Sequence, residues 1–190
     1  MKRIEAVTCI HQHLPGSSLV VACNGMNSRE LYSVGDRPEH FYMIGSMGLA
    51  SSIGLGVALR RPERPVVILD GDGNVLMNLG TLGNIGESAP ANLFHLVIDN
   101  GVHASTGGQR TISREIPLEE IARSCGYLRS ERVGDLASLE RSLRSLWREP
   151  GPAFLLIEVE PGNVSGIGRV EMDPPEIARR FRECATGTKS

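Results

Sequence analysis

The chain has 190 residues, of which 41% are hydrophobic and 22% are charged, and its 20 Lys+Arg against 22 Asp+Glu leave a formal net charge of −2. This length suits one domain with a sizeable core, and the composition excludes a disordered tail, a collagen repeat and a disulfide-stapled miniprotein. The near-neutral charge, without a long run of one sign, gives no reason to expect nucleic acid or a membrane surface as partner.

Short apolar runs alternate with longer segments of helical periodicity along the chain. Strands are predicted at 18–23, 41–44, 65–70, 92–99, 127–133 and 153–159, and helices at 51–61, 75–88, 117–125, 136–149 and 174–185. This alternation predicts an α/β fold, in which an open, mostly parallel six-stranded sheet is covered by helices on both faces. No repeat or linker interrupts the pattern, so we expect residues 1–190 to form a single domain.

The cysteines and the N-terminus bear on the compartment. No two of the four cysteines form a Cys-x-x-Cys pair, so their spacing supports neither a zinc site nor an iron–sulfur cluster. Charged residues and histidines stand at the N-terminus in place of an apolar signal region, and no window resembles a membrane span. We therefore expect a cytoplasmic protein with free thiols.

Glycines gather where three of the predicted strands end. Gly45 follows the second predicted strand, Gly71 and Gly73 follow the third, and Gly101 follows the fourth. In an open α/β sheet, ligands bind at the carboxyl ends of the strands, and glycine lets backbone N–H groups approach a phosphate closely. The pattern predicts a cradle for a phosphorylated cofactor.

Two polar side chains stand at neighbouring strand ends. Asp72 precedes a predicted helix, and Asn100 follows the next strand along the chain. An Asp-Gly pair alone is typical of a turn. A carboxylate, an amide oxygen and a backbone carbonyl are, however, hard oxygen ligands of the kind that Mg²⁺ takes together with phosphate oxygens. The pair of strand ends therefore favours a magnesium diphosphate site.

Gly71-Asp72-Gly73, followed by a helix, a strand and Asp99-Asn100, resembles the thiamine diphosphate motif. The flanking stretches GSMGLASSIGLGVAL and NGVHASTGGQRT are similar to the cofactor-diphosphate domain of phosphonopyruvate decarboxylase and of the sulfopyruvate decarboxylase β subunit. The resemblance covers residues 20 to 160. It implies thiamine diphosphate and Mg²⁺ as cofactors, and decarboxylation of sulfopyruvate or phosphonopyruvate to the aldehyde and CO₂.

The resemblance also assigns roles to residues of this sequence. Asp72 and Asn100 would be side-chain ligands of Mg²⁺, with the carbonyl of Val102 as a third ligand, and Asp99 stands where the family has an Asn. Met47 would support the bend between the two rings of the cofactor. The other implied cofactor contacts are Asn24, Gly45, Ser46, Gly71, Gly73, Asn74, His103 and Ala104.

The interpretation of three further features of the sequence leaves alternatives open. Residues 24–30 match the family's diphosphate loop loosely, and a helix N-cap at Asn27 or Ser28 explains them equally well. His103 could act catalytically, by holding the substrate or shuttling a proton, or could contact the diphosphate. Arg110 could reach a sulfonate or phosphonate, or could be a solvated surface residue.

The resemblance finally implies that part of the active site lies elsewhere. The family's glutamate that activates the aminopyrimidine ring comes from a pyrimidine-binding domain, and no acidic segment of this chain resembles it. We therefore expect an oligomer with an α-type partner subunit that carries this domain, and no activity for the chain alone. Two alternatives are the β subunit of another thiamine diphosphate-dependent 2-oxoacid enzyme and a non-catalytic cofactor-binding module.

Overall fold

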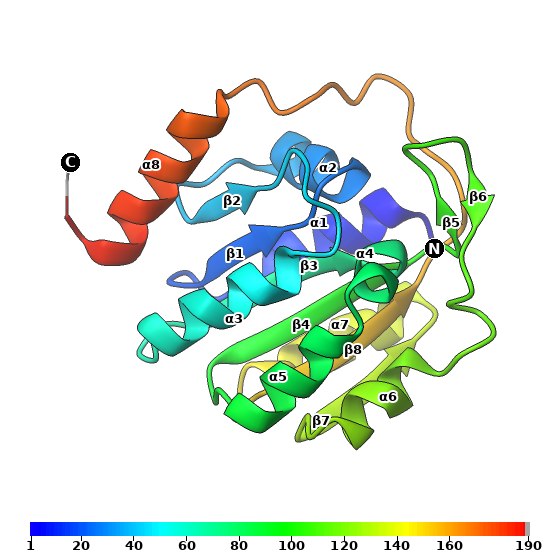
Figure 1. Cartoon of the computed structure of the whole chain (residues 1–190). Helices are drawn as coiled ribbons and strands as arrows, with labels where there is room; N and C mark the ends of the chain where they lie inside the picture. The colour runs from blue at the N-terminus through cyan, green and yellow to red at the C-terminus, as the bar shows by residue number, and fades with distance from the viewer. Residues whose placement is uncertain (189–190) are drawn as a thin grey trace.

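The computed structural model describes residues 1–188, and its centre is a sheet with the strand order β2-β1-β3-β4-β8-β7 (Figure 1). Every neighbouring pair in this sheet is parallel. The strands are β1 (Leu19–Ala22), β2 (His40–Tyr42), β3 (Val66–Gly71), β4 (Leu93–Asp99), β7 (Arg129–Val133) and β8 (Ala153–Glu158). The predicted six-stranded sheet is confirmed.

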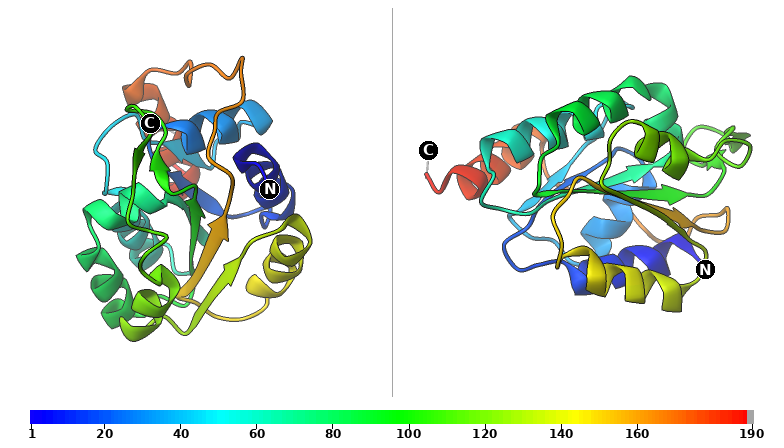
Figure 2. Two further views of the ribbon diagram at one scale, coloured as in Figure 1. Left: turned by 90° about the vertical axis from the view of Figure 1, so that its right-hand side faces the viewer. Right: turned by 90° about the horizontal axis from the view of Figure 1, so that it is seen from below.

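Helices cover both faces of the sheet (Figure 2). The helices α1, α2 and α7 pack on one face, and α3, α5 and α6 pack on the other, while α8 lies against the edge strand β2. The bounds are α1 (Arg3–His13), α2 (Met26–Val34), α3 (Ala50–Arg60), α4 (Asp72–Met77), α5 (Gly80–Ser88), α6 (Leu118–Ser124), α7 (Leu136–Leu146) and α8 (Pro174–Thr186). Within residues 1–188, no helix has both the length and the apolar sequence needed to cross a membrane.

The prediction of one helix over 75–88 is wrong, because two helices, α4 and α5, occupy this region. The backbone leaves helical geometry at Asn78, whose φ is −142° and ψ is 53°. The Asn78 amide donates a hydrogen bond to the Gly48 carbonyl at 3.1 Å. A tertiary contact with a distant turn therefore accompanies the break, which helical periodicity alone does not signal.

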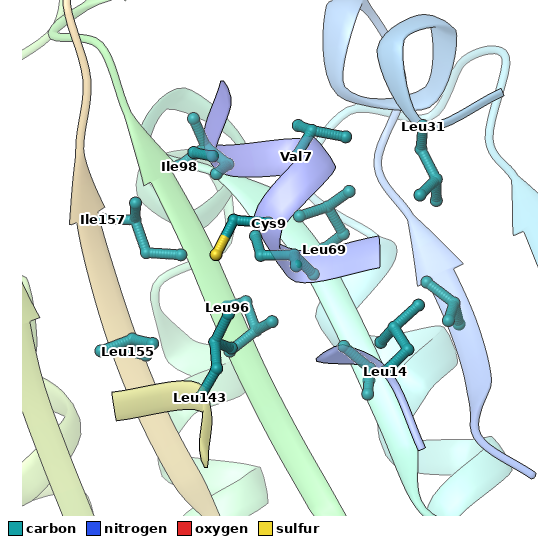
Figure 3. Close-up of a cluster of buried hydrophobic side chains, with 14 of the residues drawn as sticks. Val7, Cys9, Leu14, Leu31, Leu69, Leu96, Ile98, Leu143, Leu155 and Ile157 are labelled. Carbon is teal, nitrogen blue, oxygen red and sulfur yellow. The ribbon is translucent and has the colours of Figure 1, made fainter. Parts of the chain in front are cut away.

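Consecutive residues of the central strands point to opposite layers of the core. Leu69 and Leu96 pack beside Leu143 and Val7 under α1 and α7 (Figure 3), whereas Ile68 belongs to the cluster on the opposite face. All five side chains are fully buried, and burial of one such side chain contributes about 1.5–3 kcal/mol. Burial on both faces explains why the strands are continuous apolar runs.

The strand order places a crevice between β1 and β3. From β1 the chain passes to β2 on one side, and then crosses back to β3 on the other side of β1. Ligands of open α/β sheets bind at such a reversal, outside the carboxyl ends of the strands. A small antiparallel hairpin, β5 (Val102–His103) and β6 (Gln109–Arg110), follows β4 at this end (Figure 1). The hairpin was not among the predicted elements.

Candidate functional site

A cavity opens where β1, β3 and β4 end. Its walls come from the loop after β1, from the start of α4 and from the segment between β4 and β6. The predicted cofactor residues that line it are Asn24, Met47, Gly71, Asp72, Gly73, Asn74, Asn100, Val102, His103 and Ala104. Two predicted residues, Gly45 and Ser46, do not line it and instead face a separate, mostly apolar hollow with Leu49 and Ile53.

Asp72 is the first residue of α4, and its carboxylate is held by two hydroxyl groups. The Thr111 hydroxyl donates a hydrogen bond to Asp72 Oδ2 at 2.5 Å, and Ser113 Oγ lies 3.1 Å from the same oxygen. All three side chains are buried. Burial raises the pKa of the Asp72 carboxyl and the nearby Asp99 raises it further, whereas the two hydroxyl groups lower it. This hydroxyl pair, Thr111 and Ser113, was missed in the sequence.

Asp99 joins the same cluster. Its Oδ1 lies 2.8 Å from Ser113 Oγ and accepts the Gly101 N–H at 2.9 Å, while its buried Oδ2 has no hydrogen-bond partner within residues 1–188. Asp72, Asp99, Thr111 and Ser113 make four close O···O contacts, but the two hydroxyl groups supply only two protons. A bound cation would therefore stabilise this cluster.

Asn100 directly follows β4, and its side chain orders the turn there. Its Oδ1 accepts the Val102 N–H at 3.1 Å. Within residues 1–188, no group of three or more His, Cys, Asp or Glu side chains could hold a metal ion. A metal beside Asp72 would therefore take amide, carbonyl and ligand oxygens, which suits Mg²⁺ better than a transition metal.

Gly73 is packed against side chains from two other segments. A Cβ atom at Gly73 would lie 2.6 Å from His103 Cε1 and 3.1 Å from Met47 Cε. A side chain at this position would therefore force the His103 ring away from the first turn of α4. The packing around Gly73 brings His103 and Met47, which are far apart in sequence, to one wall of the cavity.

The turn before α3 is tied to α4 through Asn74. Asn74 Oδ1 accepts the Gly48 N–H at 2.8 Å, and Gly48 has a φ of +92°, a region in which other residues are strained. With this oxygen engaged, the Asn74 NH₂ group is the part of the side chain left for a ligand. The contact fixes the position of Met47 relative to Gly73.

The loop after β1 does not use a side-chain N-cap. The helix α2 begins at Met26 with Gly25 as N-cap, so the expectation of a cap at Asn27 or Ser28 is wrong. Asn27 instead donates to the Asp70 carbonyl at 2.9 Å and thereby joins the ends of β1 and β3. Asn24 lines the cavity, and its buried Oδ1 has no hydrogen-bond partner in the described part of the chain.

Arg3 is a cavity residue that sequence reasoning missed. It comes from α1 and is 4% exposed, and it is the one Lys or Arg among the residues that line the cavity. Its Nε and Nη2 donate to Glu30 Oε1 at 3.0 and 2.9 Å, and Nη2 also donates to Asn163 Oδ1. No local motif marks Arg3, because only the packing of α1 on the sheet brings it here.

Arg110 does not reach the cavity. It is 78% exposed, and its Nη2 lies 3.4 Å from Glu115 Oε1. The structure thus places it on the outer side of the hairpin, in an ion pair that solvent screens.

A buried polar chain supports the end of β3. His95 Nε2 lies 3.1 Å from Asp70 Oδ2, and His95 Nδ1 lies 3.1 Å from the Tyr127 hydroxyl. Asp70 Oδ1 accepts the Gly71 N–H at 2.9 Å. The position of Gly71, next to Asp72, is therefore fixed by hydrogen bonds as well as by the sheet.

Comparison with known proteins gives a family and several relatives. Residues 21–157 match the family model described as "Thiamine pyrophosphate enzyme, C-terminal TPP binding domain". The chain is 48% identical over 184 residues to phosphonopyruvate decarboxylase of Streptomyces viridochromogenes, a match that covers 97% of this chain and 46% of that protein. It is 44% identical over 182 residues to sulfopyruvate decarboxylase subunit beta of Methanothermobacter thermautotrophicus, covering 95% of this chain and 94% of that subunit. The chain thus spans about half the length of the phosphonopyruvate decarboxylases that it matches.

Solved structures give the same fold. The benzoylformate decarboxylase of Polynucleobacter necessarius superposes with a TM-score of 0.70 at 14% identity, over 84% of this chain and 33% of that chain. A protein from Mycobacterium smegmatis, described as a "putative thiamin diphosphate-dependent enzyme", has a TM-score of 0.67 at 18% identity, over 85% of this chain and 32% of that chain. At these identities the likeness concerns the fold alone.

Proposed function

The chain belongs to the thiamine pyrophosphate enzymes, and we propose that it forms the half of a decarboxylase that holds the cofactor's diphosphate. The observation that carries this proposal is the cavity at the ends of β1, β3 and β4, which gathers Asn24, Asp72 and Asn100 from three strand ends. Glycines and asparagines at such ends present N–H groups to a phosphate.

In this proposal Mg²⁺ is held by the side chains of Asp72 and Asn100 and by the Val102 carbonyl. The oxygen cluster around Asp72 supports this, because it has more acceptors than protons. Its hydroxyl groups engage Oδ2 of Asp72, and Oδ1 has no hydroxyl partner. The one negative charge that remains on a magnesium diphosphate group would be met by backbone N–H groups.

The cofactor would supply the electron sink for loss of CO₂ from a 2-oxoacid. The chain's own residues would orient it. Met47 packs against the position of Gly73 and would support the folded cofactor, while the Asn24, Gly71, Gly73, Asn74 and Ala104 positions would contact the diphosphate side. Gly45 and Ser46 would contact the pyrimidine side of the cofactor from the turn before α3. His103 would donate or accept a proton through its imidazole ring.

For the substrate we propose a three-carbon 2-oxoacid with a terminal sulfonate or phosphonate, converted to the aldehyde and CO₂. The support is the naming of the relatives, at 44–48% identity over nearly the whole chain, as sulfopyruvate and phosphonopyruvate decarboxylases. For the location we propose the cytoplasm.

For the partner we propose a subunit that carries the pyrimidine-binding domain. Two observations support it. The Methanothermobacter relative, matched over 94% of its length, is named a beta subunit. Among the residues that line the cavity, Asp72 is the sole carboxylate, and its Oδ2 is already engaged, which supports the proposal that another chain or domain supplies the carboxylate for the aminopyrimidine ring.

The experiment is to assay the chain alone and together with such a subunit. We expect no aldehyde from sulfopyruvate or phosphonopyruvate with either protein alone, and formation of aldehyde and CO₂ with both. Robust turnover by the isolated chain, at a homogeneous monomer mass, would overturn the partner proposal. Cofactor binding without turnover of any 2-oxoacid would favour the non-catalytic module, and turnover that needs an electron acceptor would favour a 2-oxoacid oxidoreductase.

A further inference from the structure

A second cavity, of about 370 Å³, adjoins the cofactor cavity. Gly25 lines both cavities, so they meet at the N-cap of α2. The next turn of α2 contributes Ser28 and Arg29 to the second cavity, and Arg169 comes from the segment between β8 and α8. This segment passes over α2 (Figure 1). The volume lies within the range of small-molecule sites.

The second cavity has positive charge and no anion to balance it. It is lined by Arg29 and Arg169, by no aspartate or glutamate, and otherwise by small or apolar side chains such as Met43 and Met172. Within residues 1–188, neither arginine makes an ion pair or a side-chain hydrogen bond. Arg29 is half-buried, so its charge is partly removed from water without a protein partner.

Other arginines near the strand ends are already paired. Arg114 contacts Glu158 at 2.9 Å, Arg132 contacts Glu119 at 2.7 Å, and the exposed Arg110 faces Glu115. Arg60, the last residue of α3, is also without a partner in the described structure, but it is exposed to solvent. Arg29 and Arg169 thus differ from these arginines, because they line a cavity and have no acidic partner in the described structure.

We propose that Arg29 and Arg169 form the subsite for the terminal sulfonate or phosphonate of the substrate, an inference that rests on the proposed function. The planar guanidinium group presents paired N–H donors that match the oxygens of such anions. Because Gly25 lines both cavities, a substrate held beside the cofactor would bring its distal anion to the two arginines. Pyruvate, which lacks this anion, would gain nothing from them, and the subsite would therefore set specificity.

The first test measures binding without turnover. The probe is 3-sulfopropanoate, which lacks the reactive ketone, titrated calorimetrically into the assembled enzyme loaded with thiamine diphosphate and Mg²⁺. We expect Arg29→Gln and Arg169→Gln each to weaken its binding about tenfold or more, since each removes charge-assisted hydrogen bonds. Arg60→Gln is the matched control and should leave the affinity for 3-sulfopropanoate unchanged. Propanoate has no second anion, so all three variants should bind it with the affinity of the unaltered enzyme.

The second test measures specificity. The ratio of kcat/KM for sulfopyruvate over that for pyruvate should fall about tenfold or more in Arg29→Gln and Arg169→Gln, with unchanged affinity for thiamine diphosphate. Arg29→Lys keeps the charge and should retain part of the ratio. Because Arg169 is exposed, Arg169→Glu tests the subsite at a position where misfolding is not expected, and it should lower the ratio further.

The outcomes separate the two proposals. If the assembled enzyme converts sulfopyruvate and both arginine variants behave like Arg60→Gln, the subsite assignment is wrong and the proposed function stands. If no 2-oxoacid is converted although the cofactor binds, the proposed function fails. If, in that case, the arginine variants bind 3-sulfopropanoate about tenfold more weakly than the unaltered protein, Arg29 and Arg169 form an anion-binding site, although the proposed reaction does not take place.

Discussion

Replacing Thr111 by valine tests whether the hydroxyl pair prepares Asp72 for a metal. The substitution keeps the shape of the side chain and removes the proton that is donated to Asp72 Oδ2 at 2.5 Å. A hydrogen bond to a charged group is worth about 1.5–3 kcal/mol, and about 1.4 kcal/mol corresponds to a tenfold change in an equilibrium constant. Because Ser113 still lies 3.1 Å from the same oxygen, we expect the lower end of this range. Thr111→Val should raise the Kd of thiamine diphosphate about tenfold at fixed Mg²⁺, as measured by calorimetry.

The matched control is Thr81→Val. Thr81 is as buried as Thr111, and its hydroxyl lies 3.2 Å from the neutral hydroxyl of Ser52, away from the cavity. Both variants should lose unfolding free energy, Thr81→Val less because its partner is neutral, but only Thr111→Val should lose cofactor affinity, and Thr111→Ser should recover it. An unchanged Kd in Thr111→Val, or an equal change in Thr81→Val, would refute the reasoning.

Two further predictions concern stability. Gly86→Ala should lower the unfolding free energy by about 3 kcal/mol in urea titrations, because its Cβ would lie 1.6 Å from the Cys125 carbonyl oxygen. Gly83→Ala, in the same helix with open space around it, should be neutral or stabilise by up to about 1 kcal/mol. Equal effects of the two substitutions would contradict the packing argument. Burial, with the charge of Arg37, lowers the pKa of His40 from 6.5 to about 3, so the folded state resists a proton that the unfolded chain takes up. The unfolding free energy should therefore fall as the pH drops from 6.5 towards 3, by roughly 1.4 kcal/mol per pH unit from this residue. His40→Gln should reduce this dependence of the unfolding free energy on pH, as measured by urea titrations. An unchanged pH dependence would count against the lowered pKa of His40.

The sheet was predictable because its strands are continuous apolar runs of the right length. The run at 65–70 appears as β3, and that at 92–99 as β4, each buried on both faces. The division of 75–88 into α4 and α5 was not predictable, because the contact from Asn78 to Gly48 forms only in the folded chain. The hairpin was also missed, since its strands have two residues each and carry no periodicity.

The candidate site was predictable to the extent that it follows strand ends. Asp72 and Asn100 could be paired in advance because the carboxyl ends of parallel strands meet at one edge of the sheet. Arg3, Thr111 and Ser113 could not be found in this way. Arg3 reaches the cavity from α1, whereas Thr111 and Ser113 reach the Asp72 carboxylate from an irregular segment after β6, so only tertiary packing brings them to the site.

The central claim is that Asp72 holds Mg²⁺ for the diphosphate of thiamine diphosphate. The most direct measurement is a calorimetric titration of thiamine diphosphate into the chain assembled with its partner subunit, once in the presence of Mg²⁺ and once in EDTA. The titration compares the unaltered chain, Asp72→Ala and the control Glu87→Ala, which changes an exposed acidic residue of α5. We predict binding that requires Mg²⁺, is lost in Asp72→Ala and is kept in Glu87→Ala. Equal affinity in EDTA, or unchanged affinity in Asp72→Ala, would contradict the claim.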